Sequence, residues 1–263
     1  MGIRTDLAAE SINLADTKDY FCEKNGNFEL HFAEILKEEN TDKPSGKYVT
    51  LYFDDVEKIT DLKPLEEQFL KTLSLLNLKG ENVLVAGLGN RDITADSIGP
   101  KTAEKILATR HIMGEFAKSI GLEGLKSVSV TVPDVLGKTG VEVQEILSGI
   151  VSKTGVDTVI VIDALCAKNE SRIFKTIQFT DSGIAPGSGV KNSRREISKS
   201  TLGVKVIAIG VPTVIEFPNN DNNLIVTPKE CDLLSDRLSE IIARCLNLYL
   251  QPNIDPEVLF SLV

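Results

Sequence analysis

The sequence predicts an α/β fold, in which helices cover both faces of a mostly parallel central sheet in three layers, with small peripheral strands beside it. Apolar, β-branched runs recur along the chain, and segments with apolar residues at helical spacing separate several of them. The run at 83–86 passes through a Gly-Leu-Gly turn directly into a helical pattern. This strand–turn–helix unit is typical of open α/β sheets, which carry their chemistry at the carboxyl ends of the strands.

Composition narrows the class of protein. The 263 residues carry a net charge of −9, and 42% of them are hydrophobic, which is typical of a globular chain. The acidic balance argues against a nucleic-acid partner. No apolar run reaches transmembrane length, and we expect no membrane partner. The four cysteines lack the spacing of zinc or redox motifs, and no signal peptide is recognisable, so we expect a cytoplasmic protein.

In the first part of the chain, residues 1–26 are polar and are expected to form an arm. Alternation at 28–32 and a β-rich run at 47–53 predict two strands that pair antiparallel at the edge of the main sheet. Apolar spacing predicts a helix over 61–76. The strand at 83–86 follows, and then a helix from Ser97 that is closed by His111, where a histidine favours a helix end.

In the second part, apolar runs predict strands at 127–132, 157–163, 173–179 and 204–211. The pair Thr139 and Glu142 matches a capping box that opens a helix through Val151. A second capping box begins at Thr227, with proline at the first helical position. It opens a long helix whose expected apolar face is formed by Leu233, Leu234, Leu238, Ile241, Ile242 and Cys245. The glycine- and serine-rich segment 181–195 is a long loop, and such loops are often functional.

Carboxylates are the first candidates for chemistry. Asp92 and Asp96 follow the glycine turn, and Asp163 ends the strand at 157–163. Because carboxyl ends of parallel strands meet at one edge of a sheet, Asp96 and Asp163 are expected to converge over one crevice. Two close carboxylates share a proton, so one can activate a water while the other donates to a carbonyl. A helix-capping role for each aspartate is the alternative.

Other site types have weaker support. Gly87 and Gly89 form only the front of a dinucleotide fingerprint, which disfavours a nucleotide site. Ser188 is a possible nucleophile for a Ser-His-Asp triad, and Cys166 for a Cys-His dyad. The chain has two histidines, and neither His31 nor His111 is locally placed for these roles.

Several motifs together resemble the germination protease family of spore-forming bacteria. They run in order from about Arg4 to about Phe217 and include Arg-Thr-Asp-Leu-Ala at 4–8, Gly-Leu-Gly-Asn at 87–90, Thr-Ala-Asp-Ser-Ile-Gly-Pro at 94–100, Ile-Asp-Ala-Leu at 162–165, Pro-Gly-Ser-Gly-Val at 186–190 and Gly-Val-Pro-Thr-Val at 210–214. The glycine-rich loop and the last of these runs are the most specific.

The resemblance implies an endopeptidase that degrades small acid-soluble spore proteins during germination. It implies a fold related to hydrogenase-maturation endopeptidases, and a homotetrameric zymogen in the forespore and spore core. The family's proposed catalytic aspartates correspond to Asp96 and Asp163. Its cleavage preference, after an acidic residue and before a hydrophobic residue and alanine, points to Asp6–Leu7 as the self-processing bond, although the acidic residue expected at position 3 is Ile3. Residues 1–10 are then a pro-segment and 11–263 a single peptidase domain.

Further candidate site residues are expected in the glycine turn and in the long loop. In the glycine turn, the backbone N–H groups of Gly87, Gly89 and Asn90 are candidates to stabilise a developing oxyanion. The alternative is that Gly87 and Gly89 only allow the tight turn. In the long loop, the residues expected to border the substrate groove are Ser188, Lys191, Arg194 and Arg195. The alternative is that this basic run is simply exposed to solvent. The related maturation enzymes hold a metal with carboxylates and a histidine. Without a matching histidine we expect no metal and no other cofactor here. A metal-dependent endopeptidase and a non-enzymatic anion-binding module remain as alternatives.

Overall fold

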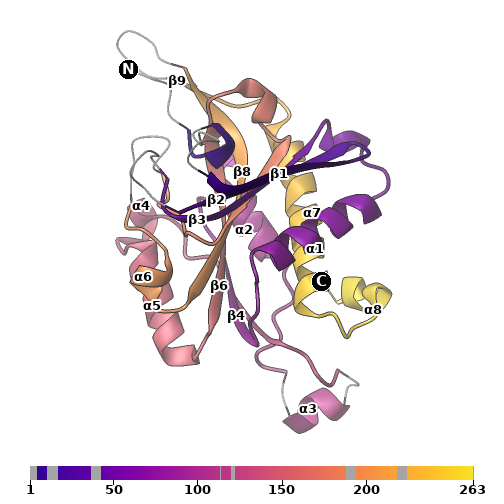
Figure 1. Cartoon of the computed structure of the whole chain (residues 1–263). Coiled ribbons are helices and arrows are strands. Elements are labelled where there is room, and N and C mark those ends of the chain that lie inside the picture. The colour runs from indigo at the N-terminus through magenta and orange to yellow at the C-terminus, as the bar shows by residue number, and fades with distance from the viewer. Residues whose placement is uncertain are drawn as a thin grey trace.

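Helices cover both faces of one mixed sheet in the computed structural model, which describes residues 5–10, 17–36, 43–112, 114–119, 122–187, 194–217 and 224–262 (Figure 1). The α/β class and the three-layer arrangement are therefore confirmed. No helix in these ranges is both long and apolar enough to cross a bilayer.

The sheet is parallel at its centre and antiparallel toward one side. Its order is β1-β2-β3-β7-β8-β6-β4-β5, and β9 pairs with β8 beyond this path. Strands β5, β4, β6 and β8 run parallel, whereas the remaining pairs are antiparallel. The strand bounds are β1 Thr17–Asn25, β2 Phe28–Ile35, β3 Gly46–Phe53, β4 Asn82–Gly87, β5 Ser127–Thr131, β6 Thr158–Ala167, β7 Thr176–Thr180, β8 Lys205–Phe217 and β9 Leu224–Val226.

The helices form the two outer layers. In Figure 1, α1 and α7 lie to the right of β4 and β6, and α5 and α6 lie to the left. The helix bounds are α1 Lys63–Leu75, α2 Ile98–Ala103, α3 Gly114–Ser119, α4 Leu136–Thr139, α5 Val143–Thr154, α6 Lys199–Leu202, α7 Cys231–Leu250 and α8 Pro256–Ser261. Short 3-10 helices occupy Ala8–Glu10 (η1), Val56–Lys58 (η4), Thr94–Asp96 (η5) and Glu170–Arg172 (η6).

The protein has one hydrophobic core on each face of the sheet, and alternating side chains of the central strands contribute to both. On β4, Val83 and Val85 pack with α1 and α7, while Leu84 and Ala86 pack on the other face with Leu147 of α5. Because both faces are covered, these strands are apolar at nearly every position, which is why they are recognisable as continuous apolar runs.

The prediction that residues 1–26 form a polar arm is wrong for the second half of this segment. Thr17–Asn25 forms β1, the edge strand, and pairs antiparallel with β2. The predicted pairing of 28–32 with 47–53 is confirmed, but β3 also pairs with β7, so these strands extend the main sheet. β1 was missed because its side chains are mostly exposed and show no apolar alternation.

The helix after the glycine turn is shorter than expected. α2 ends at Ala103, so His111 lies in a turn and does not close it. After α2, the side chain of Asn247 on α7 forms hydrogen bonds with two backbone groups of the turn. Its Oδ1 accepts from the Leu107 N–H, and its Nδ2 donates to the Lys105 carbonyl.

Both predicted capping boxes are wrong, although both helices exist. Thr139 belongs to α4, where its hydroxyl donates to the Val135 carbonyl, and Glu142 itself is the N-cap of α5. The Thr227 hydroxyl donates instead to the Thr213 carbonyl on β8, at 2.8 Å. On α7, Leu233 is 58% exposed and does not belong to the apolar face.

Close packing of α2 on β4 and β6 requires glycine at two positions. A Cβ on Gly99 would lie 2.2 Å from the Leu88 carbonyl oxygen and 2.4 Å from that of Ile162. A Cβ on Gly87 would lie 2.2 Å from the Gly99 carbonyl oxygen. These contacts are with backbone atoms, which cannot move without shifting the strands that carry the site.

We therefore predict that Gly99→Ala lowers the free energy of unfolding by about 1–3 kcal/mol or more, because overpacking forces the backbone to move. Denaturant unfolding measures this change. Gly149→Ala on α5 is the matched control, since a Cβ there meets no atom within 4 Å and alanine favours a helix. Equal stability of the two variants would contradict the packing argument.

Candidate active site

A cavity of about 460 Å³ lies beyond the carboxyl ends of the parallel strands. Asp96 and Asp163 both line it, so the two aspartates predicted to converge are brought to one cleft. Its wall also includes Gly89, Asn90, Asp134, Cys166 and Arg194. Residues that follow β4 and β5 meet there with residues of the C-terminal halves of β6 and β8. Ligands of parallel sheets bind at this edge.

Asp163 is a buried carboxyl inside the sheet. It is 5% exposed and pairs in register with Gly210 of β8. β6 continues to Ala167, so the expectation that Asp163 ends its strand is wrong. Burial raises the pKa of Asp163 well above its ordinary value, and the nearby charges of Asp96 and Asp6 raise it further. Asp163 therefore retains a proton that an exposed aspartate would lose.

Asp96 has a more polar setting at the end of η5. Burial raises its pKa, the Asn90 N–H that donates to its Oδ2 at 2.8 Å opposes this, and the charge of Asp134 adds to the rise. The Thr213 hydroxyl of β8 donates to the Ala95 carbonyl at 2.6 Å and ties η5 to the sheet. The alternative role as a helix cap does not apply, because Asp96 lies inside η5 and its carboxylate faces the glycine loop.

Two of the oxyanion candidates have structural tasks. Gly89 has φ +108°, and a Cβ there would lie 2.2 Å from the Asp96 carbonyl oxygen and 2.9 Å from its Oδ1. Glycine therefore lets the Asp96 carboxylate approach the loop. The Asn90 N–H is already engaged by Asp96. Gly87 is absent from the cavity wall, so it serves the packing of α2 rather than an oxyanion.

Asp134 is a third carboxylate of the cleft wall that sequence analysis did not single out. It follows β5 and has φ +61°, an uncommon conformation for a residue other than glycine. Lys138 lies 3.3 Å from its Oδ2. The sequence did carry one signal for Asp134, because this residue comes directly after Pro133 and the predicted strand at 127–132. Asp92, by contrast, is an exposed residue that pairs with Lys138.

The predicted basic border of the groove is only partly present. Arg194 lines the cleft, whereas Arg195 lies 2.7 Å from Glu145 on α5 and is absent from the cavity wall. Ser188 and Lys191 lie outside the described residues.

The thiol alternative lacks a histidine among the described residues of the cleft wall. Burial and the charge of Asp6 raise the pKa of the Cys166 thiol to about 11, so the thiol is protonated. Neither His31 nor His111 lines the cleft.

The N-terminal segment borders this cleft, and Asp6 forms part of its wall. The Asp6 N–H donates to the Cys166 carbonyl, and the Cys166 N–H donates to Asp6 Oδ2, each at 2.9 Å. The next two residues, Leu7 and Ala8, are fully buried. Leu7 packs against Leu165, Ala167 and Ile184.

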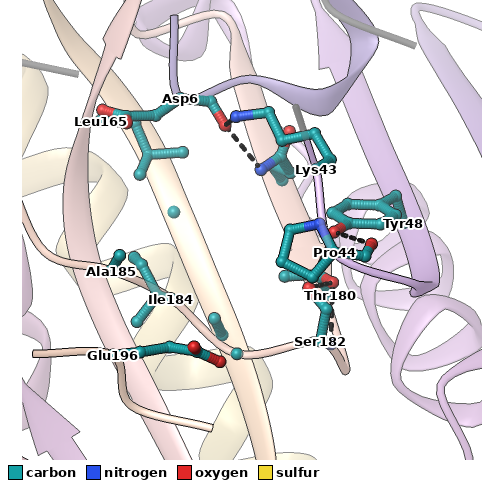
Figure 2. A pocket seen from close by; sticks show the side chains of 14 residues that line it. Asp6, Lys43, Pro44, Tyr48, Leu165, Thr180, Ser182, Ile184, Ala185 and Glu196 are labelled. Atoms are coloured by element: carbon teal, nitrogen blue, oxygen red, sulfur yellow. Dashed lines mark hydrogen bonds between the residues drawn. The ribbon is translucent and has the colours of Figure 1, made fainter. Parts of the chain in front are cut away.

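A second cavity, of about 250 Å³, adjoins the first, and Asp6 and Leu165 line both. Figure 2 shows Lys43 reaching the Asp6 main chain from the opposite wall. Lys43 Nζ donates to the Asp6 carbonyl at 3.0 Å and to that of Thr5 at 3.2 Å. The buried Gln178 of β7 accepts from the Ala8 N–H and donates to the Asp6 carbonyl at 3.4 Å. The carbonyl of the Asp6–Leu7 peptide group therefore accepts hydrogen bonds from two side chains, Lys43 and Gln178.

Comparison with known proteins identifies the family. Residues 23–219 match the family model of the germination protease, peptidase family A25. The chain is 34% identical to the germination protease of Clostridium acetobutylicum, with 96% of each chain covered. It is 36% identical to that of Caldanaerobacter subterraneus over 97% of this chain and 96% of the relative. For Bacillus velezensis the identity is 40%, over 81% of this chain and 63% of the longer relative.

Among solved structures, the chain is similar to the NiFe hydrogenase maturation protease HycI from Thermococcus kodakarensis. The TM-score is 0.40 and the identity is 18%, over 66% of this chain and 98% of that one. The family assignment rests on the sequence relatives, which match most of the chain and agree in their description. The chain is an endopeptidase that belongs to the germination protease family.

Proposed function

We propose that this chain degrades small acid-soluble spore proteins during germination, with Asp96 and Asp163 as its catalytic pair. Family membership supports a protease of spore germination. The observation that carries the mechanism is the buried Asp163, whose pKa is raised well above its ordinary value next to a second carboxylate. A carboxyl pair in which one member keeps its proton is equipped for general acid–base catalysis.

In the proposed mechanism, Asp96 is the base and Asp163 the acid. The Asn90 N–H stabilises the ionised form of Asp96, which accepts a proton from the attacking water. Asp163 is protonated and donates to the carbonyl oxygen of the scissile bond. The water oxygen bonds to the carbonyl carbon, and the C–N bond then breaks as the leaving amine takes a proton from the pair.

A metal-dependent mechanism fits the cleft residues poorly. In the described part of the chain, the one group of three His, Cys, Asp or Glu ligand atoms within 4.8 Å of one another lies on the β1–β2 hairpin, outside the cleft. The aspartates of the cleft do not converge closely enough to form such a group. The anion-binding alternative is wrong, because it supposed a non-enzymatic module and the family is enzymatic.

Self-processing at Asp6–Leu7 is part of the proposal. Asp6 lies beside Asp163, whose pKa its charge raises, and the segment is bound through its main chain. The Asp6 carbonyl oxygen, which would carry the developing negative charge, already accepts from Lys43 Nζ and Gln178 Nε2. We assign these two groups as oxyanion donors. Until the bond is cut, Asp6 stays in the cleft wall beside Asp163, which accounts for an inactive zymogen.

We also propose that the enzyme acts in the spore core as a homotetramer. The family assignment supports the location. Exposed apolar residues at Phe217 and along β9 form the kind of surface that a subunit interface covers.

For catalysis, we predict that Asp96→Asn and Asp163→Asn each reduce cleavage by about a hundredfold to ten-thousandfold, the usual contribution of a general acid or base. The assay is cleavage of a purified small acid-soluble spore protein by chains that begin at Leu7. Asp92→Asn is the matched control, because this exposed carboxylate pairs with Lys138 outside the cavity wall and should leave the rate unchanged.

A chelator should leave wild-type cleavage unchanged. Loss of activity with chelator and its return with added metal would instead support the metal-dependent alternative. Full activity of both cleft variants would overturn the site assignment.

For stability, we predict that Asp163→Asn raises the free energy of unfolding at neutral pH. The folded protein holds the Asp163 proton more tightly than the unfolded chain, so this group favours folding at low pH and loses that contribution as pH rises through its raised pKa. Asparagine mimics the protonated form at every pH. The gain should vanish below about pH 4, where aspartate is protonated in both states.

Denaturant unfolding across pH measures this difference. Asp92→Asn serves as the control and should give no gain at neutral pH, since the pKa of Asp92 is lowered by Lys138. A variant Asp163→Asn that is less stable than wild type at neutral pH would contradict the assignment of a raised pKa.

For self-processing, we predict a new N-terminus at Leu7 on acidification of the full chain, read by intact mass. Gln178→Ala should slow its appearance by about a hundredfold, the typical cost of losing an oxyanion donor. Gln144→Ala is the matched control, because that amide donates to the Thr201 carbonyl on α6 and does not touch the segment. A different N-terminus would reject the assigned bond, and equal rates would reject the role of Gln178.

A further inference from the structure

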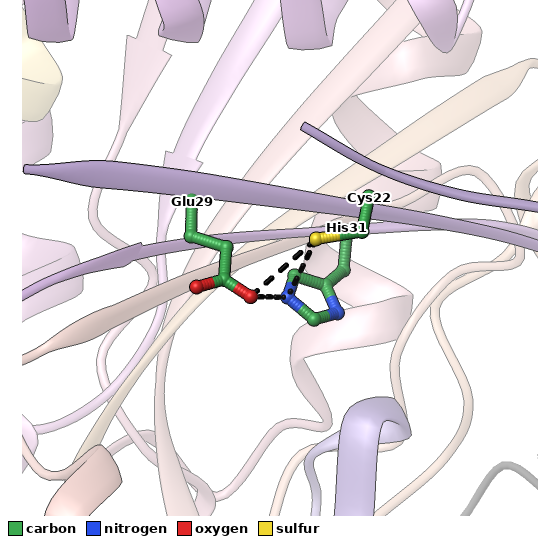
Figure 3. A group of neighbouring side chains, drawn as sticks. All are labelled: Cys22, Glu29 and His31. Atoms are coloured by element: carbon green, nitrogen blue, oxygen red, sulfur yellow. Dashed lines mark hydrogen bonds and ion pairs between the residues drawn. The ribbon is translucent and has the colours of Figure 1, made fainter. Parts of the chain in front are cut away.

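The β1–β2 hairpin carries a cluster of three different metal-ligating side chains outside the cleft. Cys22, Glu29 and His31 point toward one another on one face of the hairpin (Figure 3). Their ligand atoms all lie within 4.8 Å of one another. The catalytic proposal uses none of these residues.

The strand register places the cluster. Cys22 of β1 is directly opposite His31 of β2, and Glu29 lies two residues before His31 on the same strand. Residues two apart on a strand share a face, and directly opposed residues are cross-strand neighbours. The backbone of the hairpin therefore holds all three side chains together without any ion.

The distances suit a tetrahedral ion. Cys22 Sγ lies 3.5 Å from His31 Nε2 and 3.4 Å from Glu29 Oε1. Zinc bonds of about 2.3 Å to sulfur and 2.0 Å to nitrogen or oxygen give tetrahedral edges of about 3.5 Å from sulfur to either atom. The third edge, from His31 Nε2 to Glu29 Oε1, is 2.6 Å because the two atoms share a hydrogen bond. It must open to about 3.3 Å when an ion takes the place of the proton.

Neighbouring groups orient two of the ligands. The Tyr20 hydroxyl lies 3.0 Å from His31 Nδ1, so the ring presents Nε2 to the cluster. Outer partners of this kind fix metal-binding histidines in known sites. Lys24 lies 3.0 Å from Glu29 Oε2, which leaves Oε1 facing the cluster.

We propose that Cys22, Glu29 and His31 bind a divalent cation of the zinc class, with water as the fourth ligand. The thiolate and imidazole select zinc over magnesium or calcium, which prefer oxygen ligands alone. Binding releases the thiol proton to solvent, and the ring proton moves from Nε2 to Nδ1 so that His31 coordinates as a neutral imidazole. Its Nδ1–H then donates to the Tyr20 hydroxyl. The ion joins the edge strand β1 to β2. Tyr20 and His31 also line a cavity with Ala8 and Ala9, so the ion stabilises the sheet edge beside the N-terminal segment.

Calorimetric titration of the full chain with Zn²⁺, after chelator treatment, tests the site. We expect one equivalent to bind, and Cys22→Ser and His31→Gln each to weaken it by at least about tenfold. Glu34→Gln is the matched control, because it removes a carboxylate of the same strand that pairs with Lys18 and should bind as wild type. Unchanged stoichiometry and affinity in Cys22→Ser and His31→Gln would overturn the proposal.

Two further readouts keep the test independent of folding and of proteolysis. Co²⁺ in place of Zn²⁺ should give a thiolate charge-transfer band in wild type and Glu34→Gln, and none in Cys22→Ser. Zn²⁺ should raise the Tm of wild type but not of Cys22→Ser, since an ion that binds only the folded state stabilises it. A Co²⁺ band or a Tm rise that persists without the Cys22 thiol would place the ion elsewhere and reject the site.

Discussion

A carboxyl group buried inside a parallel sheet is the constraint on which the rest of the site depends. Asp163 is surrounded by the ladder of β6 and β8 and is 5% exposed, so its charged form is costly. The groups around Asp163 define this environment. Gly210 leaves room in the neighbouring strand, and the Leu165 side chain fills that room. Asp96 is held on a short 3-10 helix close enough for its charge to raise the pKa of Asp163. Two carboxyl groups of one residue type thus lie in two different environments, one almost fully buried and one that accepts a backbone hydrogen bond.

The N-terminal segment shows how such a cleft binds a peptide. Asp6 is held by main-chain and side-chain hydrogen bonds to Cys166, the strand residue that lies three positions beyond Asp163. Lys43 and Gln178 donate to the Asp6 carbonyl oxygen, and Leu7 packs among apolar side chains. Recognition through the main chain suits an endopeptidase, because any extended substrate offers the same groups.

Sequence patterns predicted the central elements well, because buried parallel strands are apolar at nearly every position. The runs at 83–86 and 157–163 became β4 and β6, and both aspartates that follow or belong to them line the cleft. Predictions of helix ends failed where a group far away in the sequence formed a hydrogen bond with the backbone or hydroxyl group concerned. Asn247 ends the helix pattern after Ala103, and the Thr213 carbonyl takes the hydroxyl of Thr227. The edge strand β1 was missed because exposed residues carry no apolar alternation.

The sequence by itself determined the α/β class, the order of the central strands along the chain, the candidate aspartates and the family, because all of these depend on local pattern and motif. Only the tertiary structure decided that Asp163 lies inside its strand rather than at the end, that Asp134 and Asp6 join the cleft, and that Gly87 packs against α2 instead of facing the substrate. It alone brought Cys22 opposite His31. Burial, pKa and cross-strand register depend on residues far apart in the chain, and no local pattern records them.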